Sequence, residues 1–117
     1  MKKSVIEEKS YDFAVSIVKL CYSLSSVNKE FVLSKQLLRS GTSIGANIRE
    51  ASQGQSRADF LSKTSISLKE ANESLYWLDL LFDTNFIDKE KHNEYSTKCI
   101  ELIKILTSII KTTKARN

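Results

Sequence analysis

The sequence predicts an all-α protein, an antiparallel up-and-down bundle of four helices in a single domain over residues 1–117. The chain has no proline and only three glycines, so it lacks the turn residues that sheet-rich folds require. Apolar residues recur every three or four positions in four segments, and the short connections favour antiparallel neighbours. We expect helices over about residues 10–27, 31–54, 57–84 and 89–112.

The composition is that of a soluble globular protein, with 41% hydrophobic and 27% charged residues. No apolar run approaches the ~20 residues of a membrane span. Acidic residues follow the first lysines, where a signal peptide would be apolar. We therefore expect a cytoplasmic protein that makes no membrane contact. Cys21 and Cys99 fall at helix-core positions and are expected to be reduced and buried.

Three of the helices have simple apolar stripes and recognisable caps. Ser4 and Glu7 are expected to cap a frayed lead-in turn, Ser56 with Asp59 to cap the third helix, and Asp88 the fourth. The polar stretch 25–28 ends the first helix and is expected to cap the second. The stripes are Phe13, Ile17, Leu20, Cys21, Leu24 and Val27; Leu61, Thr64, Leu68, Ala71, Leu75, Leu78 and Phe82; and Tyr95, Cys99, Leu102, Leu106 and Ile109.

The second helix carries a strip of small residues beside its core face. At ~100° per residue the core face holds Leu33, Leu37, Ile44, Ile48 and Ala51, and the strip holds Ser34, Gly41, Gly45 and Ser52. A glycine inside a helix costs about 1 kcal/mol relative to alanine. We therefore expect another backbone to pack closely against Gly41 and Gly45.

Two polar strips occupy the rest of this helix. Ser40, Ser43 and Asn47, with Glu50 at their edge, are poor residues for a helix interior. We expect them to hydrogen-bond to a neighbouring helix or subunit; the alternative is a solvated strip.

The other polar strip is basic. It contains Lys35, Arg39 and Arg49, with Arg57 continuing its direction. Cations at this spacing can contact phosphates without reading sequence, so RNA or DNA is a candidate ligand. The alternatives are an ordinary solvated face and pairing with acids of a neighbouring subunit.

The third helix is apolar on a second side. Ile66, Trp77 and Leu80 lie opposite its core stripe, among charged residues. A helix that is apolar on two sides is buried on two sides, so we expect these residues to form the interface of a homo-oligomer.

Two motifs resemble a bacterial family. They are QLLRSGTSIGANIREA over residues 36–51, and DFLSK, KEANES and YWL over residues 59–63, 69–74 and 76–78. These segments resemble the four helix bundle protein family, also called the 23S rRNA intervening-sequence protein family, over about residues 10–113. The resemblance implies a bundle that assembles into a ring, typically a homopentamer. A related branch is the accessory protein of diversity-generating retroelements, which binds reverse transcriptase and nucleic acid.

The sequence offers little for catalysis, so we expect no enzyme, no cofactor and no metal. The single histidine, His92, lacks the Glu-x-x-His spacing of a di-metal bundle and is expected at the surface. Glu50, Glu70 and Glu73 lack an imidazole partner and are expected to be solvated or salt-bridged. A ring-shaped adaptor that binds a protein partner, such as a reverse transcriptase, is the alternative to nucleic-acid binding.

Overall fold

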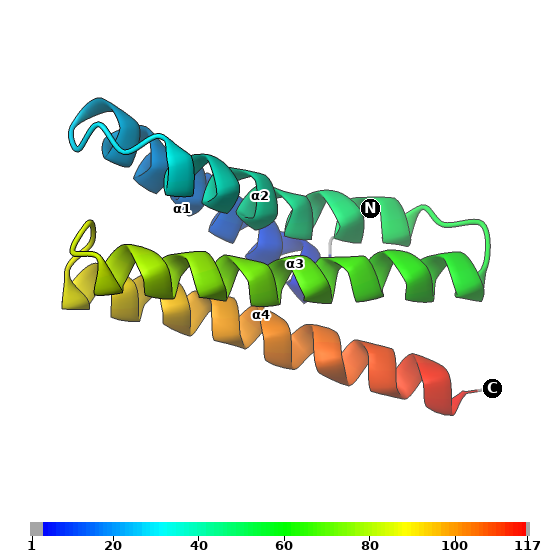
Figure 1. Ribbon diagram of the computed structural model, residues 1–117. Coiled ribbons are helices and arrows are strands. Elements are labelled where there is room, and N and C mark those ends of the chain that lie inside the picture. Colours follow the sequence, from blue (N-terminus) through cyan, green and yellow to red (C-terminus); the bar gives the residue numbers. More distant parts are fainter. Residues whose placement is uncertain (1–3, 117) are drawn as a thin grey trace.

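The computed structural model describes residues 4–116, which form the predicted four-helix bundle (Figure 1). The helices are α1 (Val5–Ser26), α2 (Val32–Ser52), α3 (Arg57–Asp83) and α4 (Lys89–Ala115), and they run alternately up and down. Over this range no strand occurs, and no helix combines the length and hydropathy needed to cross a bilayer.

The predicted caps are present at three helix starts. The hydroxyl of Ser4 accepts a hydrogen bond from the amide of Glu7 (3.3 Å), that of Ser56 from Asp59 (3.1 Å), and the Asp88 carboxylate from Lys91 (2.8 Å). The predicted start of the first helix near residue 10 was wrong. Because Ser4 supplies a complete cap, the first turn is a regular part of α1 and not a frayed lead-in.

The cap of α2 was also predicted wrongly. The Glu30 carboxylate, and not the 25–28 stretch, accepts hydrogen bonds from the amides of Val32 (3.1 Å), Leu33 (3.0 Å) and Ser34 (2.7 Å). Glu30 is buried, and the Ser34 hydroxyl donates back to its carbonyl oxygen (2.7 Å). A carboxylate therefore satisfies three of the free amides at the positive end of the helix dipole.

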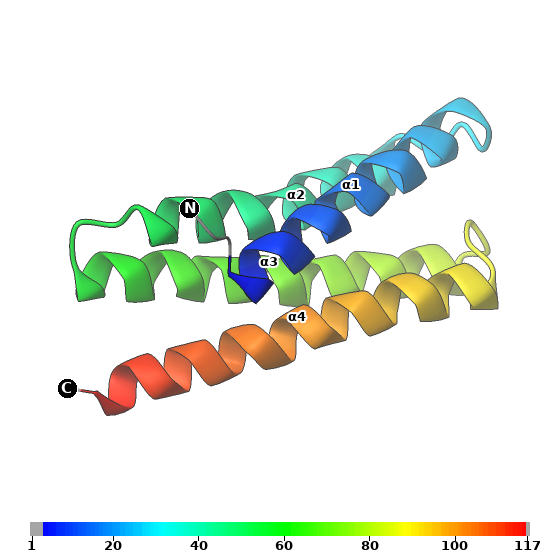
Figure 2. The same cartoon turned by 180° about the vertical axis from the view of Figure 1, so that it is seen from behind.

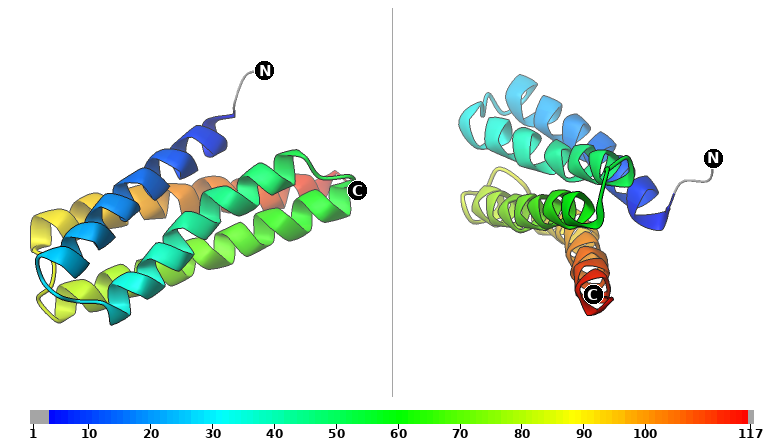
Figure 3. Two further views of the ribbon diagram at one scale, coloured as in Figure 1. Left: turned by 90° about the horizontal axis from the view of Figure 1, so that it is seen from above. Right: turned by 90° about the vertical axis from the view of Figure 1, so that its right-hand side faces the viewer.

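The bundle is centred on α2 and α3, which share the most extensive contact. The first helix packs on α2 and the last on α3, and of the four pairs of helices in contact α1 and α4 share the least (Figure 3). Seen from behind, α1 begins short of the end of α2, and α4 diverges toward its C-terminal end (Figure 2). This opening forms a groove of about 330 Å³ whose apolar lining includes Ile6, Ile48, Phe60, Leu106 and Ile109.

The core follows the predicted stripes, with Leu33, Tyr95 and Ile109 half-buried at its edge, and differs more clearly at two places. Val27 is 74% exposed, because the chain leaves the helix before it. In α3 the buried positions include Ser67, Ser74 and Leu81 as well as Thr64, Ala71 and Leu78, and the predicted Leu61, Leu68, Leu75 and Phe82 are half-buried. The reason is that α3 packs against two helices at once, with the serines turned toward α2.

The small strip of α2 is where α1 approaches. A methyl group built on Gly41 would lie 2.9 Å from Cγ2 of the fully buried Ile17, whereas one built on Gly45 would lie 3.4 Å from both the backbone carbonyl oxygen and the hydroxyl oxygen of Ser10. The helix runs unbroken through both glycines. Gly41 is thus required for the close approach of α1, and Gly45 leaves room for a methyl.

We predict opposite effects for alanine at the two glycines. Gly41→Ala should lower the free energy of unfolding by about 1–3 kcal/mol, because its methyl overlaps a β-branched core side chain. Gly45→Ala is the matched control and should raise it by up to about 1 kcal/mol through helix propensity. Urea unfolding measures both; equal stabilisation by the two variants would remove the close-approach explanation.

The Glu30 cap predicts a pH dependence. Burial raises the pKa of this carboxyl, but the three amide hydrogen bonds outweigh burial and hold the pKa below its usual 4.5. Because the folded-state pKa is the lower one, the cap stabilises the fold above pH 4.5, and the stabilisation is lost as the pH falls through the folded value.

Glu30→Gln should therefore destabilise the protein by about 1–2 kcal/mol at pH 7, with the difference from wild type shrinking in acid. Urea unfolding at a series of pH values tests this. A difference that stays constant from pH 7 to pH 3 would contradict the assignment.

Candidate functional site

Hydroxyl groups bridge α2 and α3 inside the bundle. Ser67 donates to the carbonyl of Ile44 (2.7 Å), and Ser74 donates to the Ser40 hydroxyl (2.9 Å); all three serines are fully buried. Ser40 therefore makes the bond to a neighbouring helix that the sequence predicted. The side chains are short enough to let the two backbones approach, and their bonds compensate for the loss of water.

The other members of this polar strip behave differently. Ser43 donates to the carbonyl of Arg39 (2.6 Å), and Asn47 donates to the carbonyl of Ser43 (2.9 Å). Within the subunit, the expected bonds of Ser43 and Asn47 to a neighbouring helix are not formed. Both side chains lie over the preceding turn of their own helix, where a carbonyl oxygen is within reach.

The Arg39 guanidinium connects α2 to two acids of α3. It pairs with Glu70 (Nη1 to Oε2, 2.9 Å) and with Glu73, whose carboxylate also accepts from the indole of Trp77 (3.0 Å). The Arg39 side chain is 49% exposed, but that of Glu70 only 13%. Glu70, Glu73 and the Trp77 indole therefore each have a polar partner within the subunit.

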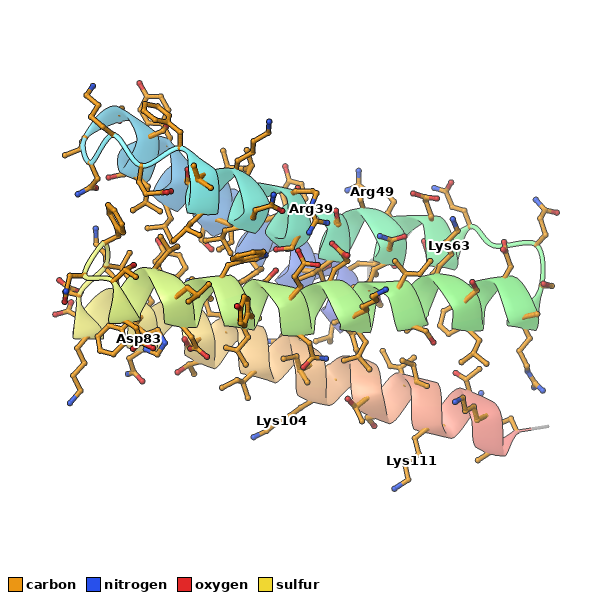
Figure 4. The ribbon with its side chains drawn as sticks, viewed as in Figure 1. Arg39, Arg49, Lys63, Asp83, Lys104 and Lys111 are labelled. Atoms are coloured by element: carbon orange, nitrogen blue, oxygen red, sulfur yellow. The ribbon has the colours of Figure 1, made fainter. Side chains whose placement is uncertain are left out.

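The position of Arg39 changes the predicted basic face. Figure 4 shows it at the α2–α3 boundary, where its charge is neutralised within its own subunit. About three turns further along α2, Glu50 pairs with Lys63 of α3 (3.1 Å). Two sets of ion pairs therefore cross this helix boundary.

The other predicted cations have surroundings that differ from those of Arg39. Arg49 is exposed, with its guanidinium 5.9 Å from the ring centre of Tyr11 on α1, and it projects outward from α2 in Figure 4. Lys35 is exposed at a groove between α1 and α2, and Arg57 is exposed at the first residue of α3. Arg39 and Arg49 thus lean toward opposite sides of α2.

A second group of cations was not predicted. Residues 102–116, in the C-terminal part of α4, contain Lys104, Lys111, Lys114 and Arg116 and no acidic residue. All four are exposed, and Figure 4 shows Lys104 and Lys111 projecting away from the bundle. The charge asymmetry of the last fifteen residues before Asn117 was the available signal in the sequence.

The outer side of α1 carries an apolar stripe that sequence reasoning also missed. Tyr11, Val15, Val18 and Tyr22 are all exposed, at spacings of four, three and four residues. Val18 and Tyr22 also line the groove of about 340 Å³ beside Lys35. The stripe is a second three-four repeat, offset from the core stripe of the same helix, and Arg49 of α2 lies near its first residue, Tyr11.

On α3 the three predicted interface residues differ in how far they are exposed. Ile66 is 41% exposed, while Trp77 and Leu80 are half-buried and Trp77 packs against the core. The neighbouring Tyr76 is 57% exposed and stacks edge-on against Trp77, with ring centres 5.1 Å apart. The outward apolar side of α3 is therefore formed by Ile66, Tyr76 and Leu80.

The titratable side chains provide little reactive chemistry. Burial raises the pKa of the Cys21 and Cys99 thiols to about 12, so neither is a thiolate at neutral pH. His92 is hydrogen-bonded to Asp79 (2.8 Å) and stacks on Phe82. Among residues 4–116 no group of three or more His, Cys, Asp or Glu side chains is arranged to hold a metal ion.

Fold and surfaces together define a four-helix-bundle protein whose notable external features are cations and apolar stripes. The chain belongs to the 23S rRNA-intervening sequence protein family, which matches residues 2–108. It is also similar to a crystal structure from Bacteroides thetaiotaomicron, described as a protein with unknown function from the S23 ribosomal protein family. The two share 57% sequence identity and a TM-score of 0.91, over 92% of this chain and 99% of that one. No curated protein matches the chain.

The Arg39 cluster predicts unequal effects for two arginines of the same helix. Arg39→Ala should lower the free energy of unfolding by about 1–3 kcal/mol, because it leaves the largely buried Glu70 without its partner. Arg49→Ala should change it by less than about 0.5 kcal/mol, as expected for an exposed side chain. Thermal and urea unfolding at moderate salt compare the two; equal, small effects would mean that the ion pairs do not stabilise the subunit.

Proposed function

We propose that the protein is a non-enzymatic scaffold that assembles into a ring and binds structured RNA or DNA through its phosphates. The observation that carries nucleic-acid binding is the acid-free end of α4, where four exposed cations lie within residues 102–116. Lys35 and Arg49 on α2 add to it, and Arg57 follows at the start of α3. The family's name, which refers to an intervening sequence of 23S rRNA, is consistent with a nucleic-acid partner.

The charge of one subunit is modest, and assembly supplies the rest. The formal net charge is +4 at pH 7. In a ring the cations of α4 recur in every subunit, which raises the local potential well above that of a monomer. Five subunits are favoured by the family resemblance. Phosphate contacts of this kind fix position without reading base sequence, so binding should depend strongly on salt and little on sequence.

Arg39 takes no part in this proposal. Reversing its charge would place a third carboxylate beside Glu70 and Glu73 and disturb the fold. A clean test therefore uses lysines that lie outside the ion pairs described within residues 4–116. Lys104 and Lys111 meet this condition, and so do Lys89 and Lys91 at the opposite end of the same helix.

We predict that Lys104→Glu/Lys111→Glu weakens binding to structured RNA and to duplex DNA alike. The slope of log K against log salt should flatten by about two, one unit for each lost phosphate contact. Lys89→Glu/Lys91→Glu carries the same charge change and should retain most of the wild-type slope. Gel shift or fluorescence anisotropy over a salt series makes the comparison.

Two results would overturn the proposal. One is wild-type protein that binds neither RNA nor DNA at low salt, which would favour the adaptor alternative with a protein partner. The other is an equal loss of affinity for both double variants, which would mean that binding depends on net charge and not on the C-terminal part of α4.

A further inference from the structure

The α1 face, defined as Tyr11, Val15, Val18 and Tyr22, follows the outer side of its helix, with Arg49 of α2 near the ring of Tyr11. It extends about 16 Å along the helix at 1.5 Å per residue. Tyr22 is 74% exposed, and the face continues into the groove that Phe31 and Leu38 of α2 also line. Contiguous apolar surface of this kind on a water-exposed helix indicates a contact with another protein surface.

A second apolar surface lies on the far side of the molecule. The α3 face, defined as Ile66, Tyr76 and Leu80, extends about 21 Å along its helix. The third helix lies toward the viewer in Figure 1, and α1 lies toward the viewer in the reverse view of Figure 2. The two helices therefore lie on opposite sides of the bundle, and one subunit cannot bring the two faces together.

The charges beside the two faces have opposite polarity along the chain. Next to the α1 face, Glu8 and Asp12 come first and Lys19 follows; next to the α3 face, Lys69 comes first and Asp79 and Asp83 follow. These six side chains are exposed, and Glu73, which lies within the α3 face, is half-buried and paired with Arg39. Suppose that α1 of one subunit lay parallel to α3 of its neighbour. The acids beside the start of the α1 face would then meet the base beside the start of the α3 face, and Lys19 would meet the acids at the other end.

The up-and-down order makes that parallel arrangement available, because α1 and α3 run in the same direction within a subunit (Figure 1). Rotation about an axis parallel to the bundle preserves this direction in every copy. Contacts between unlike faces, repeated by rotation, close into a ring. A two-fold contact of α1 with α1 would leave the α3 face uncovered.

We propose that a second copy of this chain covers the α1 face with its own α3 face, the two helices lying parallel, so that every contact in the assembly is head-to-tail. This rests on the proposed ring and specifies its interface. In this arrangement α2 and α4 form the inner and outer surfaces of the ring. The cations of α4 therefore stay outside the contact between subunits.

Two double variants test the arrangement. Val15→Glu/Val18→Glu disables the α1 face, and Ile66→Glu/Tyr76→Glu disables the α3 face; all four side chains are exposed. Each variant alone should be monomeric, at 13.3 kDa. Mixed in equal amounts, they should form a dimer with one copy of each, because the mixture still contains one intact face of each kind.

Native mass spectrometry with one variant isotopically labelled identifies the mixed dimer. Ile100→Glu, at an exposed apolar residue of α4, is the control and should assemble like wild type. Circular dichroism checks that each variant is folded, and Val18→Ser with Tyr76→Ser replaces any glutamate variant that is not.

If wild type assembles but the mixture of the two double variants stays monomeric, the head-to-tail contact is wrong and the proposed ring still stands. The same holds if the face variants assemble unchanged. Monomeric wild type would overturn both proposals.

Discussion

The close approach of α2 to both of its neighbours determines the geometry of the rest of the bundle. On one side Gly41 lets Ile17 of α1 pack against the α2 backbone, and on the other Ser67 and Ser74 bond across to α2. Larger side chains at these positions would separate the helices, and unbonded hydroxyls would destabilise the contact. The second helix is therefore held from two sides by different means, apolar packing and buried hydrogen bonds.

The ion pairs at the surface follow from this spacing. With α2 and α3 close together, Arg39 reaches both Glu70 and Glu73, and Glu73 in turn orients the Trp77 indole. Glu70 is largely shielded from water, so its pairing is under less solvent screening than an exposed pair. The segment 36–51 and the segments near residues 59–78 are thus two halves of one helix–helix interface. This explains in physical terms why these residues occur together.

Apolar periodicity and the caps at Ser56 and Asp88 were sufficient to predict the four helices and most of the core. Periodicity could not predict the Glu30 cap, because its three hydrogen bonds depend on how the chain turns between two helices. It also assigned Arg39 to a free basic face. The angular position of that residue permits either solvent or a neighbouring helix, and only the proximity of α3 decides between them. The α1 face was overlooked because its residues alternate with the core stripe, so the helix reads as broadly apolar.

The proposed assembly gives separate roles to surfaces that a lone subunit leaves unexplained. The α1 and α3 faces would be buried between copies, and the acid-free end of α4 would recur around the ring. Native mass spectrometry of the wild-type chain at micromolar concentration tests this most directly. The account predicts one closed species of at least three copies, with five favoured, unchanged on dilution through the micromolar range. A 13.3 kDa monomer, or a dimer as the largest species, would contradict it.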